Sequence, residues 1–497
     1  MSTVHEVSHD NGGPRRAKVA AELARALPAR SVLVEREDLK PYECDGLSAY
    51  RATPLVAAIP ADENEVAAVL AVARETHTPV VARGSGTGLS GGALPLADGI
   101  LLSLAKFNRI VSVDPLARTA RVQPGVTNLK ISQHVAHLGL YYAPDPSSQI
   151  ACSIGGNVAE NSGGVHCLKY GLTVHNILKV RVITVEGDVV DLGSDALDTQ
   201  GYDLLAVVTG SEGLLAITLE VTVKLLPKPE VAQVVMASFA DVQSAGEAVA
   251  RVIGAGIVPA GLEMMDKLAT RAVEGFVHAG YDLEAEAILL AESDGSREEV
   301  AHEIEKMIEV MRESGATDIR CSSSDAERLR FWSGRKAAFP AVGRISPDYY
   351  CIDGSIPRGA LAKVLKRTGE LSELYGLRCA NVFHAGDGNL HPLILYDANI
   401  PGELETTERF ACDILELCIE VGGTITGEHG VGIEKINQMC SQFRPAELAQ
   451  FHAVKAAFDP DGLLNPGKGV PTLHRCAEYG AMRAKGGALP HPDLPRF

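Results

Sequence analysis

The chain has 497 residues, of which 46% are hydrophobic and 22% are charged, and its formal net charge is −17 at pH 7. This length exceeds what a single hydrophobic core supports, so we expect two or more domains. The acidic balance argues against a nucleic-acid partner, which requires a basic face, and against direct attraction to an anionic membrane surface.

Cysteine usage and hydropathy bear on the compartment. The 10 cysteines include no Cys-x-x-Cys pair, which does not suit an iron–sulfur cluster or a structural zinc site, so free thiols in a reducing cytoplasm are expected. No apolar stretch has the length of a signal peptide near the N-terminus or of a membrane span elsewhere. We therefore expect a cytoplasmic protein whose membrane association, if any, comes through a partner.

The first part of the chain carries alternating helix and strand signals. A short amphipathic helix is predicted over residues 17–27, and Asp62-x-x-Glu65 has the pattern of a capping box that opens a second helix. A strand, Pro79–Arg83, then runs into a glycine-rich loop. Two β-hairpins are predicted next, and their strands are Ile110–Val113 with Thr119–Val122 and Val180–Val185 with Val189–Leu192.

The run Gly213–Leu226 is apolar and rich in β-branched residues, a composition that predicts a buried strand. Pro227-Lys-Pro229 ends this run, and we predict a domain boundary there. From about residue 230 to 415, helices and strands alternate. The clearest examples are the strand Ala287–Leu290, the charged helix Glu298–Ser314 and the helix Arg409–Val421.

Gly86-Thr-Gly-Leu-Ser-Gly91 matches the G-x-G-x-x-G expression of dinucleotide-binding folds, but its context does not. That fingerprint requires a helix directly after the loop, with the pyrophosphate at the helix N-terminus. Here Gly92-Ala-Leu-Pro95 and a further strand follow. We infer a different phosphate cradle, in which consecutive backbone N–H groups of a Gly/Ser loop form an anion nest.

A second glycine-rich loop is predicted over Pro144–Gly164, the run PDPSSQIACSIGGNVAENSGG. Its small residues suit the close passage of an extended polar cofactor. Two separated loops, each tied to strands, would hold one long ligand better than two small ones. The alternative is a pair of ordinary glycine turns, which the length and composition of the second loop disfavour.

Two further motifs bring histidines and a carboxylate among glycines. His384 and His391 are seven residues apart, and the Gly386-Asp-Gly388 turn between them can fold the chain so that both imidazoles converge. With Glu428 they form a His-His-carboxylate set that suits a divalent ion such as zinc or manganese. His429 then remains as a free base beside the metal. The alternative is a group of structural histidines in glycine-rich loops.

The glycine loops resemble the two FAD pyrophosphate loops of the vanillyl-alcohol-oxidase (PCMH-type) flavoprotein superfamily. The resemblance continues through Thr209–Gly213, both histidine motifs and Asn465–Lys468, and so covers nearly the whole chain. Within the superfamily, Phe331–Arg344 and Pro471–Tyr479 resemble the family of glycolate oxidase flavoprotein (D) subunits. D-lactate and D-2-hydroxyglutarate dehydrogenases are the nearby relatives.

The resemblance implies an α+β fold. A PCMH-type FAD-binding domain of two subdomains (54–228) would follow an N-terminal arm and helix (1–53). A ferredoxin-like α/β cap domain (229–415) would bind substrate, and a C-terminal helical segment and tail (416–497) would return to the flavin. The first loop contains no histidine, so FAD is expected to be non-covalent. Relatives carry a polar residue two positions after the second histidine, where this chain has Leu393.

The residues that the resemblance assigns to FAD lie in the two loops and in three later segments. They are Arg83, Gly84, Ser85, Gly86, Thr87, Gly88, Leu89, Ser90, Pro144, Asp145, Ser147, Ser148, Ala151, Ser153, Gly155, Gly156, Asn157, Asn161, Gly163, Glu212, Gly213, Ile217 and Asn465.

The implied chemistry is FAD-dependent oxidation of a short 2-hydroxy acid, glycolate or D-lactate, to the 2-oxo acid. Arg335 is the first candidate to bind the substrate carboxylate, because a guanidinium binds a carboxylate through two hydrogen bonds; Arg344 and Lys336 are weaker candidates. A metal on His384, His391 and Glu428 would polarise the substrate hydroxyl, and His429 would accept its proton. Without a metal, the same histidines would donate hydrogen bonds to the developing alkoxide.

The chain has no clustered cysteines for a redox relay of its own. The resemblance implies that electrons leave through an iron–sulfur partner subunit, alongside a second FAD-domain subunit, and that these partners make any contact with the cytoplasmic face of the inner membrane. Three alternatives remain open. The chain could act alone as a D-lactate or D-2-hydroxyglutarate dehydrogenase, it could be a non-enzymatic flavin-binding subunit, or it could be a flavin-independent metallohydrolase.

Overall fold

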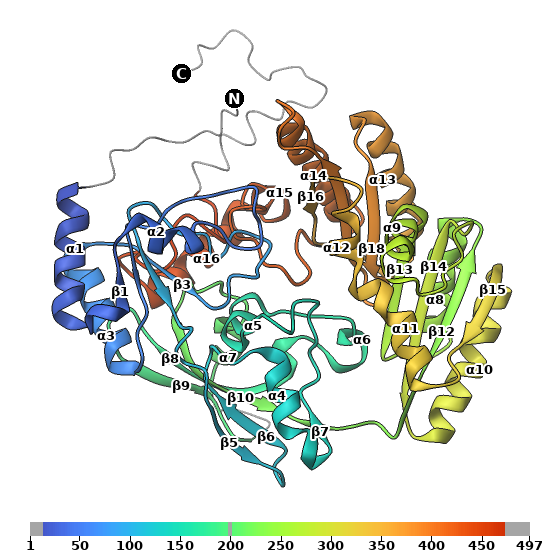
Figure 1. Ribbon diagram of the computed structural model, residues 1–497, viewed down its shortest axis with the longest axis horizontal. Helices are drawn as coiled ribbons and strands as arrows, with labels where there is room; N and C mark the ends of the chain where they lie inside the picture. Colours follow the sequence, from blue (N-terminus) through green and yellow to red (C-terminus); the bar gives the residue numbers. More distant parts are fainter. Residues whose placement is uncertain (1–12, 197–200, 473–497) are drawn as a thin grey trace.

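Three sheets organise the part of the chain that the computed structural model describes, residues 13–196 and 201–472. A four-stranded and a five-stranded sheet build the first lobe, and an eight-stranded sheet builds the cap. In Figure 1 the first lobe lies to the left and the cap to the right. Helices and strands thus alternate with antiparallel pairings, and the predicted α+β class is confirmed.

The four-stranded sheet begins the first lobe. Its strands, in the order β1-β2-β4-β3, are β1 (Val32–Leu33), β2 (Val56–Ala58), β4 (Ile100–Ser103) and β3 (Val80–Arg83). Helices α1 (Gly13–Ala26) and α3 (Glu63–Thr76) share a buried cluster with this sheet. Asp62 caps α3 by accepting a hydrogen bond from the Glu65 backbone N–H at 3.0 Å, so the predicted helix start is confirmed.

The five-stranded sheet completes the lobe and is antiparallel throughout. Its order is β5 (Ile110–Asp114), β6 (Thr119–Val122), β10 (Ile217–Lys224), β8 (Ile177–Ile183) and β9 (Val189–Gly193). Both predicted hairpins are present. The predicted strand Gly213–Leu226 is shorter than expected, because Glu212 and Gly213 adopt positive φ angles of 52° and 70° and turn the chain before β10 begins.

Short elements connect these sheets. The helices are α2 (Arg36–Leu39), α4 (Asn128–Val135), α5 (Ile154–Glu160), α6 (Cys167–Tyr170) and α7 (Leu204–Val208), and β7 (Leu140–Tyr141) pairs with β11 (Leu226–Pro227). Helix α5 corrects the prediction of one long loop over Pro144–Gly164. Its two adjacent glycines lower helix propensity, which hid it in the sequence.

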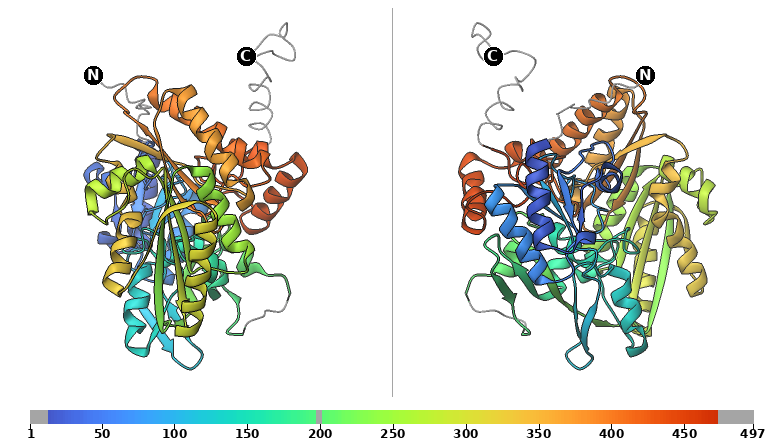
Figure 2. Two further views of the ribbon diagram at one scale, coloured as in Figure 1. Left: turned by 90° about the vertical axis from the view of Figure 1, so that its right-hand side faces the viewer. Right: turned by 60° about the vertical axis from the view of Figure 1, so that its left-hand side comes forward.

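The cap is an eight-stranded antiparallel sheet with helices on both faces (Figure 2). Its strands are β12 (Val231–Phe239), β13 (Gly261–Asp266), β14 (Ala287–Gly295), β15 (Ala316–Cys321), β16 (Asp348–Cys351), β17 (Gly354–Ser355), β18 (Cys379–His384) and β19 (Asn389–Tyr396). One face packs against α8 (Val242–Gly254), α10 (Arg297–Glu313), α13 (Leu361–Tyr375) and α14 (Glu403–Glu420). The other packs against α9 (Lys267–Val277), α11 (Asp325–Lys336) and α12 (Ala338–Val342).

Residue alternation along the cap strands decides which side chains can meet. Phe383 and Leu390 belong to the cluster under α8 and α13. Because successive residues of a strand point to opposite faces, their neighbours His384 and His391 point to the other face. Glu263, which lies between Leu262 and Met264 of the same cluster, does so as well. The fold therefore gathers two histidines and a carboxylate on the face toward α9 and α11.

The C-terminal segment returns from the cap to the first lobe. It carries α15 (Met439–Gln442) and α16 (Pro445–Phe458), which Figure 1 draws in red on the side of the first lobe. Val80 donates its backbone N–H to Leu463 O at 2.8 Å, and Asn465 donates to Val80 O at 2.8 Å, so the segment joins the edge of the four-stranded sheet. The predicted arm before residue 13 and the tail after residue 472 lie outside the described residues.

Two expectations about the compartment can be compared with the structure. Of the nine cysteines within residues 13–196 and 201–472, eight form no disulfide, as expected, whereas Cys440 is disulfide-bonded and corrects the expectation for that residue. Among residues 13–196 and 201–472, no helix combines the length and the apolar character needed to span a bilayer.

Candidate active site

A cavity of about 370 Å³ lies between the glycine-rich loops of the first lobe and the face of the cap that carries the histidines. Among the residues predicted to bind the cofactor, those lining it are Ser85, Gly86, Thr87, Gly88, Leu89, Ser147, Ser148, Ser153, Gly155, Gly156, Asn157, Glu212, Gly213 and Ile217. The others are not among its lining residues: Arg83, Gly84, Ser90, Pro144, Asp145, Ala151, Asn161, Gly163 and Asn465. The two loops thus face one shared space.

Two glycines of the first loop lie so close to neighbouring groups that no side chain would fit at their positions. A Cβ on Gly84 would clash with Ser153 Oγ of the second loop, and one on Gly86, where φ is +71°, would clash with the Arg83 guanidinium. Arg83 is itself buried and donates from Nη1 to Cys44 O at 2.8 Å. The glycines therefore let both loops approach each other, while Arg83 fixes the first loop from behind.

Helix α5 shapes the second loop. Ser153 caps it by accepting from the Gly156 backbone N–H at 3.3 Å, and a Cβ on Gly155 would lie 2.5 Å from Pro124 Cβ. Asn157 is buried and its Oδ1 accepts from Asn128 Nδ2 at 3.1 Å. The small residues of this run thus serve close packing, and the helix holds the loop rigidly at the cavity wall.

Glu212 joins the first lobe to the C-terminal motif. Its two carboxylate oxygens accept from the backbone N–H groups of Val431 and Gly432, each at 2.7 Å. Asn465 completes the junction, because its Nδ2 donates to Gly92 O at 2.9 Å and to Glu212 O at 2.7 Å. These bonds place residues that are more than 200 positions apart in sequence around one end of the cavity.

His384, His391 and Glu428 converge as the sequence predicts. Glu428 Oε1 lies 3.2 Å from His384 Nε2 and 2.9 Å from His391 Nε2, and ligand atoms of the three residues all lie within 4.8 Å of one another. The other ring nitrogens are occupied, His384 Nδ1 by Glu263 Oε1 at 2.7 Å and His391 Nδ1 by Ile352 O at 3.3 Å. Both Nε2 atoms are thereby directed toward Glu428, an arrangement that fits a divalent ion.

Arg335 lies behind this set and not at the cavity. It is 1% exposed and donates from Nε to Glu263 Oε2 at 2.6 Å, while its Nη2 has no hydrogen-bond partner. Burial alone would raise the pKa of Glu263, but the charges of His384 and Arg335 outweigh burial and lower it. Arg335 therefore keeps Glu263 ionised, and Glu263 in turn orients His384.

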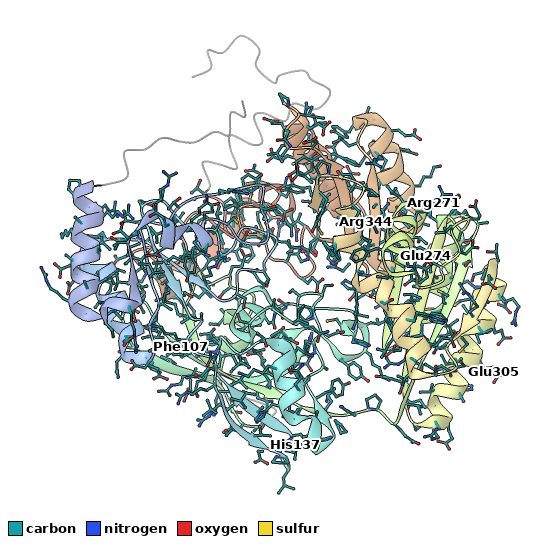
Figure 3. All side chains as sticks on the ribbon, viewed as in Figure 1. Phe107, His137, Arg271, Glu274, Glu305 and Arg344 are labelled. Carbon is teal, nitrogen blue, oxygen red and sulfur yellow. The ribbon has the colours of Figure 1, made fainter. Side chains whose placement is uncertain are left out.

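The other two predicted cap cations occupy different positions. Arg344 is exposed and donates from Nη1 to Gly275 O at 2.8 Å, close to Glu274 of α9 in Figure 3. Lys336 lines the cavity together with Phe339 and Tyr349. Among the cavity-lining residues that the structure describes, Lys336 is the cation that the cap contributes.

Asp353 was not identified from the sequence, although it organises the second histidine motif. It is fully buried, and its oxygens accept from the backbone N–H groups of Gly427, Glu428 and His429 at 3.0, 3.1 and 2.9 Å. Burial would raise its pKa, but Lys435, whose Nζ lies 3.0 Å away, holds that pKa well below its usual value. The sequence signal that could have identified Asp353 is its place as the single acidic residue in the apolar run YYCIDGSIP.

His429 has the properties of an unprotonated base. Its ring stacks on that of His391 with centroids 4.8 Å apart and planes 7° apart, and its Nδ1 is buried without a hydrogen-bond partner. Burial lowers the pKa of His429 to about 4, so the imidazole is neutral at pH 7. Cys351, a second residue absent from the sequence prediction, has a ligand atom within 4.8 Å of those of His391 and His429.

Comparison with known proteins gives two family models that together span most of the chain. A model described as FAD binding domain matches residues 54–193, and one described as FAD linked oxidases, C-terminal domain, matches residues 228–469. The chain is 61% identical to "Glycolate oxidase subunit GlcD" of Escherichia coli strain K12, covering 100% of both, and 37% identical to the protein of that name from Bacillus subtilis strain 168, covering 86% of this chain and 91% of the relative.

Further similarities reach other activities and the fold. "D-lactate dehydrogenase" of Anaerostipes hadrus is 32% identical, over 90% of this chain and 96% of the relative. The crystal structure of p-cresol methylhydroxylase with substrate bound superposes with a TM-score of 0.78 at 19% identity, covering 93% of this chain and 98% of the other. At that identity the likeness concerns the fold, and it confirms the predicted PCMH-type architecture.

Proposed function

The chain belongs to the FAD-linked hydroxy-acid oxidoreductase family that contains the glycolate oxidase flavoprotein subunits, and on that premise we propose that it oxidises glycolate to glyoxylate. The observation that carries the proposal is the position of His429. Its neutral imidazole lines the cavity that both glycine loops enclose and stacks on the ring of His391.

The chain's own residues would divide the work of oxidising the alcohol. His429 would accept the proton of the substrate hydroxyl, because its ring lines the cavity and burial keeps the imidazole neutral. His384, His391 and Glu428 would hold a divalent ion such as zinc or manganese, whose chemistry would be to polarise that hydroxyl. Bound FAD supplies the acceptor for the hydride that leaves C2 of the substrate.

Lys336 is the best-placed group to bind the substrate carboxylate, since it lines the cavity. The position of Arg335 supports a different role from the expected fork, because Glu263 occupies its Nε and the side chain is buried. It would position His384 through Glu263. Arg344 does not line the cavity, so its position does not support a role in binding substrate.

FAD would be held without a covalent bond, because the loop Arg83–Gly92 offers no histidine for attachment. Backbone N–H groups of the first loop would donate to the pyrophosphate, whereas in the second loop those of Ile154, Gly155 and Asn157 already donate to backbone carbonyls. The residues that do not line the cavity, such as Arg83 and Asn465, would support the loops from behind.

Electrons would leave through partner subunits. The 61% identical relative is named as a subunit, which supports an assembly with partner subunits. We propose that these are an iron–sulfur subunit and a second FAD-domain subunit. We place this assembly in the cytoplasm, with any membrane contact made by the partners. The D-lactate dehydrogenase relatives support the alternative of a stand-alone D-lactate or D-2-hydroxyglutarate dehydrogenase.

An anaerobic visible spectrum of the purified chain separates these possibilities. Titration with glycolate should bleach the flavin band, and D-lactate and L-lactate in parallel samples report the stereochemical preference. Bleaching by D-2-hydroxyglutarate in place of glycolate would favour the alternative. A flavin band that no 2-hydroxy acid changes would contradict the proposed activity.

A further inference from the structure

Two carboxyl groups flank Gly430, the residue that follows the candidate base. A Cβ on Gly430 would clash with Glu160 Oε2 and would lie 3.0 Å from Glu212 Oε1. Both glutamates also line the cavity. The side chains come from different segments, Glu160 from the end of α5 and Glu212 from the turn before β10, so the fold brings two acidic groups into one small space.

The two carboxyl groups differ in their hydrogen bonds. Both oxygens of Glu212 accept from backbone N–H groups, those of Val431 and Gly432 at 2.7 Å, an environment that stabilises the anion. Glu160 Oε2 is buried and has no hydrogen-bond partner. An anion without donors beside a second anion is unfavourable, so the proton of the pair resides on Glu160.

The remaining charged groups around Glu160 do not reverse this assignment. Burial raises the pKa of Glu160 well above its usual value, and the charges of Glu212 and Asp45 add to that effect. Lys435 and Lys468 oppose it, but their Nζ atoms are engaged elsewhere. Lys435 donates to Asp353 at 3.0 Å and Lys468 to Gly92 O at 3.0 Å.

The location of Glu160 indicates what its proton can meet. The neighbouring carboxylate of Glu212 would repel a pyrophosphate, whereas a neutral ring with carbonyl oxygens and ring nitrogens accepts hydrogen bonds without that penalty. Gly430 is adjacent in sequence to His429, the candidate base, so this part of the cavity lies at the reacting end.

We propose that Glu160 is a cofactor-binding donor, which Glu212 keeps in the neutral acid form and which donates its carboxyl hydrogen to an acceptor atom of the flavin ring. The inference rests on FAD binding and not on which hydroxy acid is oxidised. Its test therefore uses no substrate, and its failure is distinguishable from a failure of the proposed activity.

The test compares three variants of the full chain. Glu160→Leu removes the donor, Glu160→Gln keeps an N–H donor of similar shape, and Glu434→Leu is the matched control. Glu434 is also a buried carboxyl without hydrogen bonds to its oxygens, the nearest cation being Lys435 Nζ at 3.6 Å, but it does not line the cavity. Flavin fluorescence gives the FAD dissociation constant, and circular dichroism verifies folding.

Loss of one hydrogen bond in a buried site should raise the dissociation constant of FAD about tenfold in Glu160→Leu. Glu160→Gln should stay within about twofold of the wild type, because it still donates. The control should match the wild type in FAD affinity. Glu160→Leu binding FAD as tightly as the wild type, or Glu160→Gln binding as weakly as Glu160→Leu, would overturn the proposal.

Two further measurements address the proton and the acceptor. The infrared spectrum of the wild type should contain a protonated-carboxyl C=O band that is absent from Glu160→Gln, and absence of such a difference would refute the neutral form even if Glu160→Leu failed to fold. Binding of FMN should weaken in Glu160→Leu while binding of ADP stays unchanged. The reverse pattern would assign the donor to the pyrophosphate and overturn the flavin-ring assignment.

Discussion

Asp353→Asn should be the most destabilising isosteric change in the cap. Both Asp353 and Lys435 are 0% exposed, and the carboxylate accepts from three consecutive backbone N–H groups, those of Gly427, Glu428 and His429. The amide of Asn carries no charge and offers one acceptor oxygen. Buried Lys435 would then lose its nearer counter-ion and keep only Glu434 Oε2 at 3.6 Å, which costs about 3–5 kcal/mol of unfolding free energy.

Urea unfolding followed by circular dichroism measures this loss against a matched control, Asp348→Asn. Asp348 lies at the start of β16, in the segment that precedes Asp353, but is only partly buried and accepts from Ala398 N–H at 2.9 Å, so its replacement should cost about 1 kcal/mol. Adding Lys435→Met to Asp353→Asn should recover part of the loss, because no unpaired charge remains. Stability of Asp353→Asn within about 1 kcal/mol of the wild type would refute the reasoning.

Two other predictions concern the interface between the lobes and the candidate metal ligands His384, His391 and Glu428. Burial would lower the pKa of His166, but Asp145 at 2.8 Å and Glu292 at 3.3 Å raise it to about 10. The stabilisation of the fold by protonated His166 is therefore complete below pH 6.5 and is lost as pH rises through about 10. The loss of unfolding free energy in His166→Gln, measured by urea unfolding, should shrink over that range. A loss that does not change with pH would contradict this. A Cβ on Gly163 would lie 2.6 Å from Glu428 Oε2, so Gly163→Ala should weaken divalent-metal binding, measured by calorimetry, about 10–100-fold, and unchanged affinity would oppose the assignment.

The sequence was sufficient for the convergence of His384, His391 and Glu428. The turn between the two histidines is local, and its glycines indicate that the chain can reverse direction there. The hairpin β18–β19 realises that turn and leaves both imidazoles on one face of the cap sheet. Local chemistry of this kind, like the Asp62 cap of α3, can be inferred without knowing the tertiary structure.

The partners of that set could not be inferred in the same way. Glu263 and Asp353 act through contacts with residues more than 70 positions away, and nothing in their own segments signals it. Arg335 had the chemistry of a carboxylate fork, but the register of α11 buries it against Glu263. Helix α14 begins at Glu403, six residues before the predicted start, because its first turns are polar and lack an apolar period.

The central claim is that neutral His429 accepts the substrate proton as a 2-hydroxy acid reduces the flavin. Anaerobic stopped-flow spectroscopy of flavin reduction by glycolate tests it most directly, with His429→Asn against the control His452→Asn, whose ring contacts Pro471 O outside the cavity. His429→Asn should slow reduction about 10²–10⁴-fold, while FAD binding and the control stay unchanged. Reduction of His429→Asn at the wild-type rate would contradict the account.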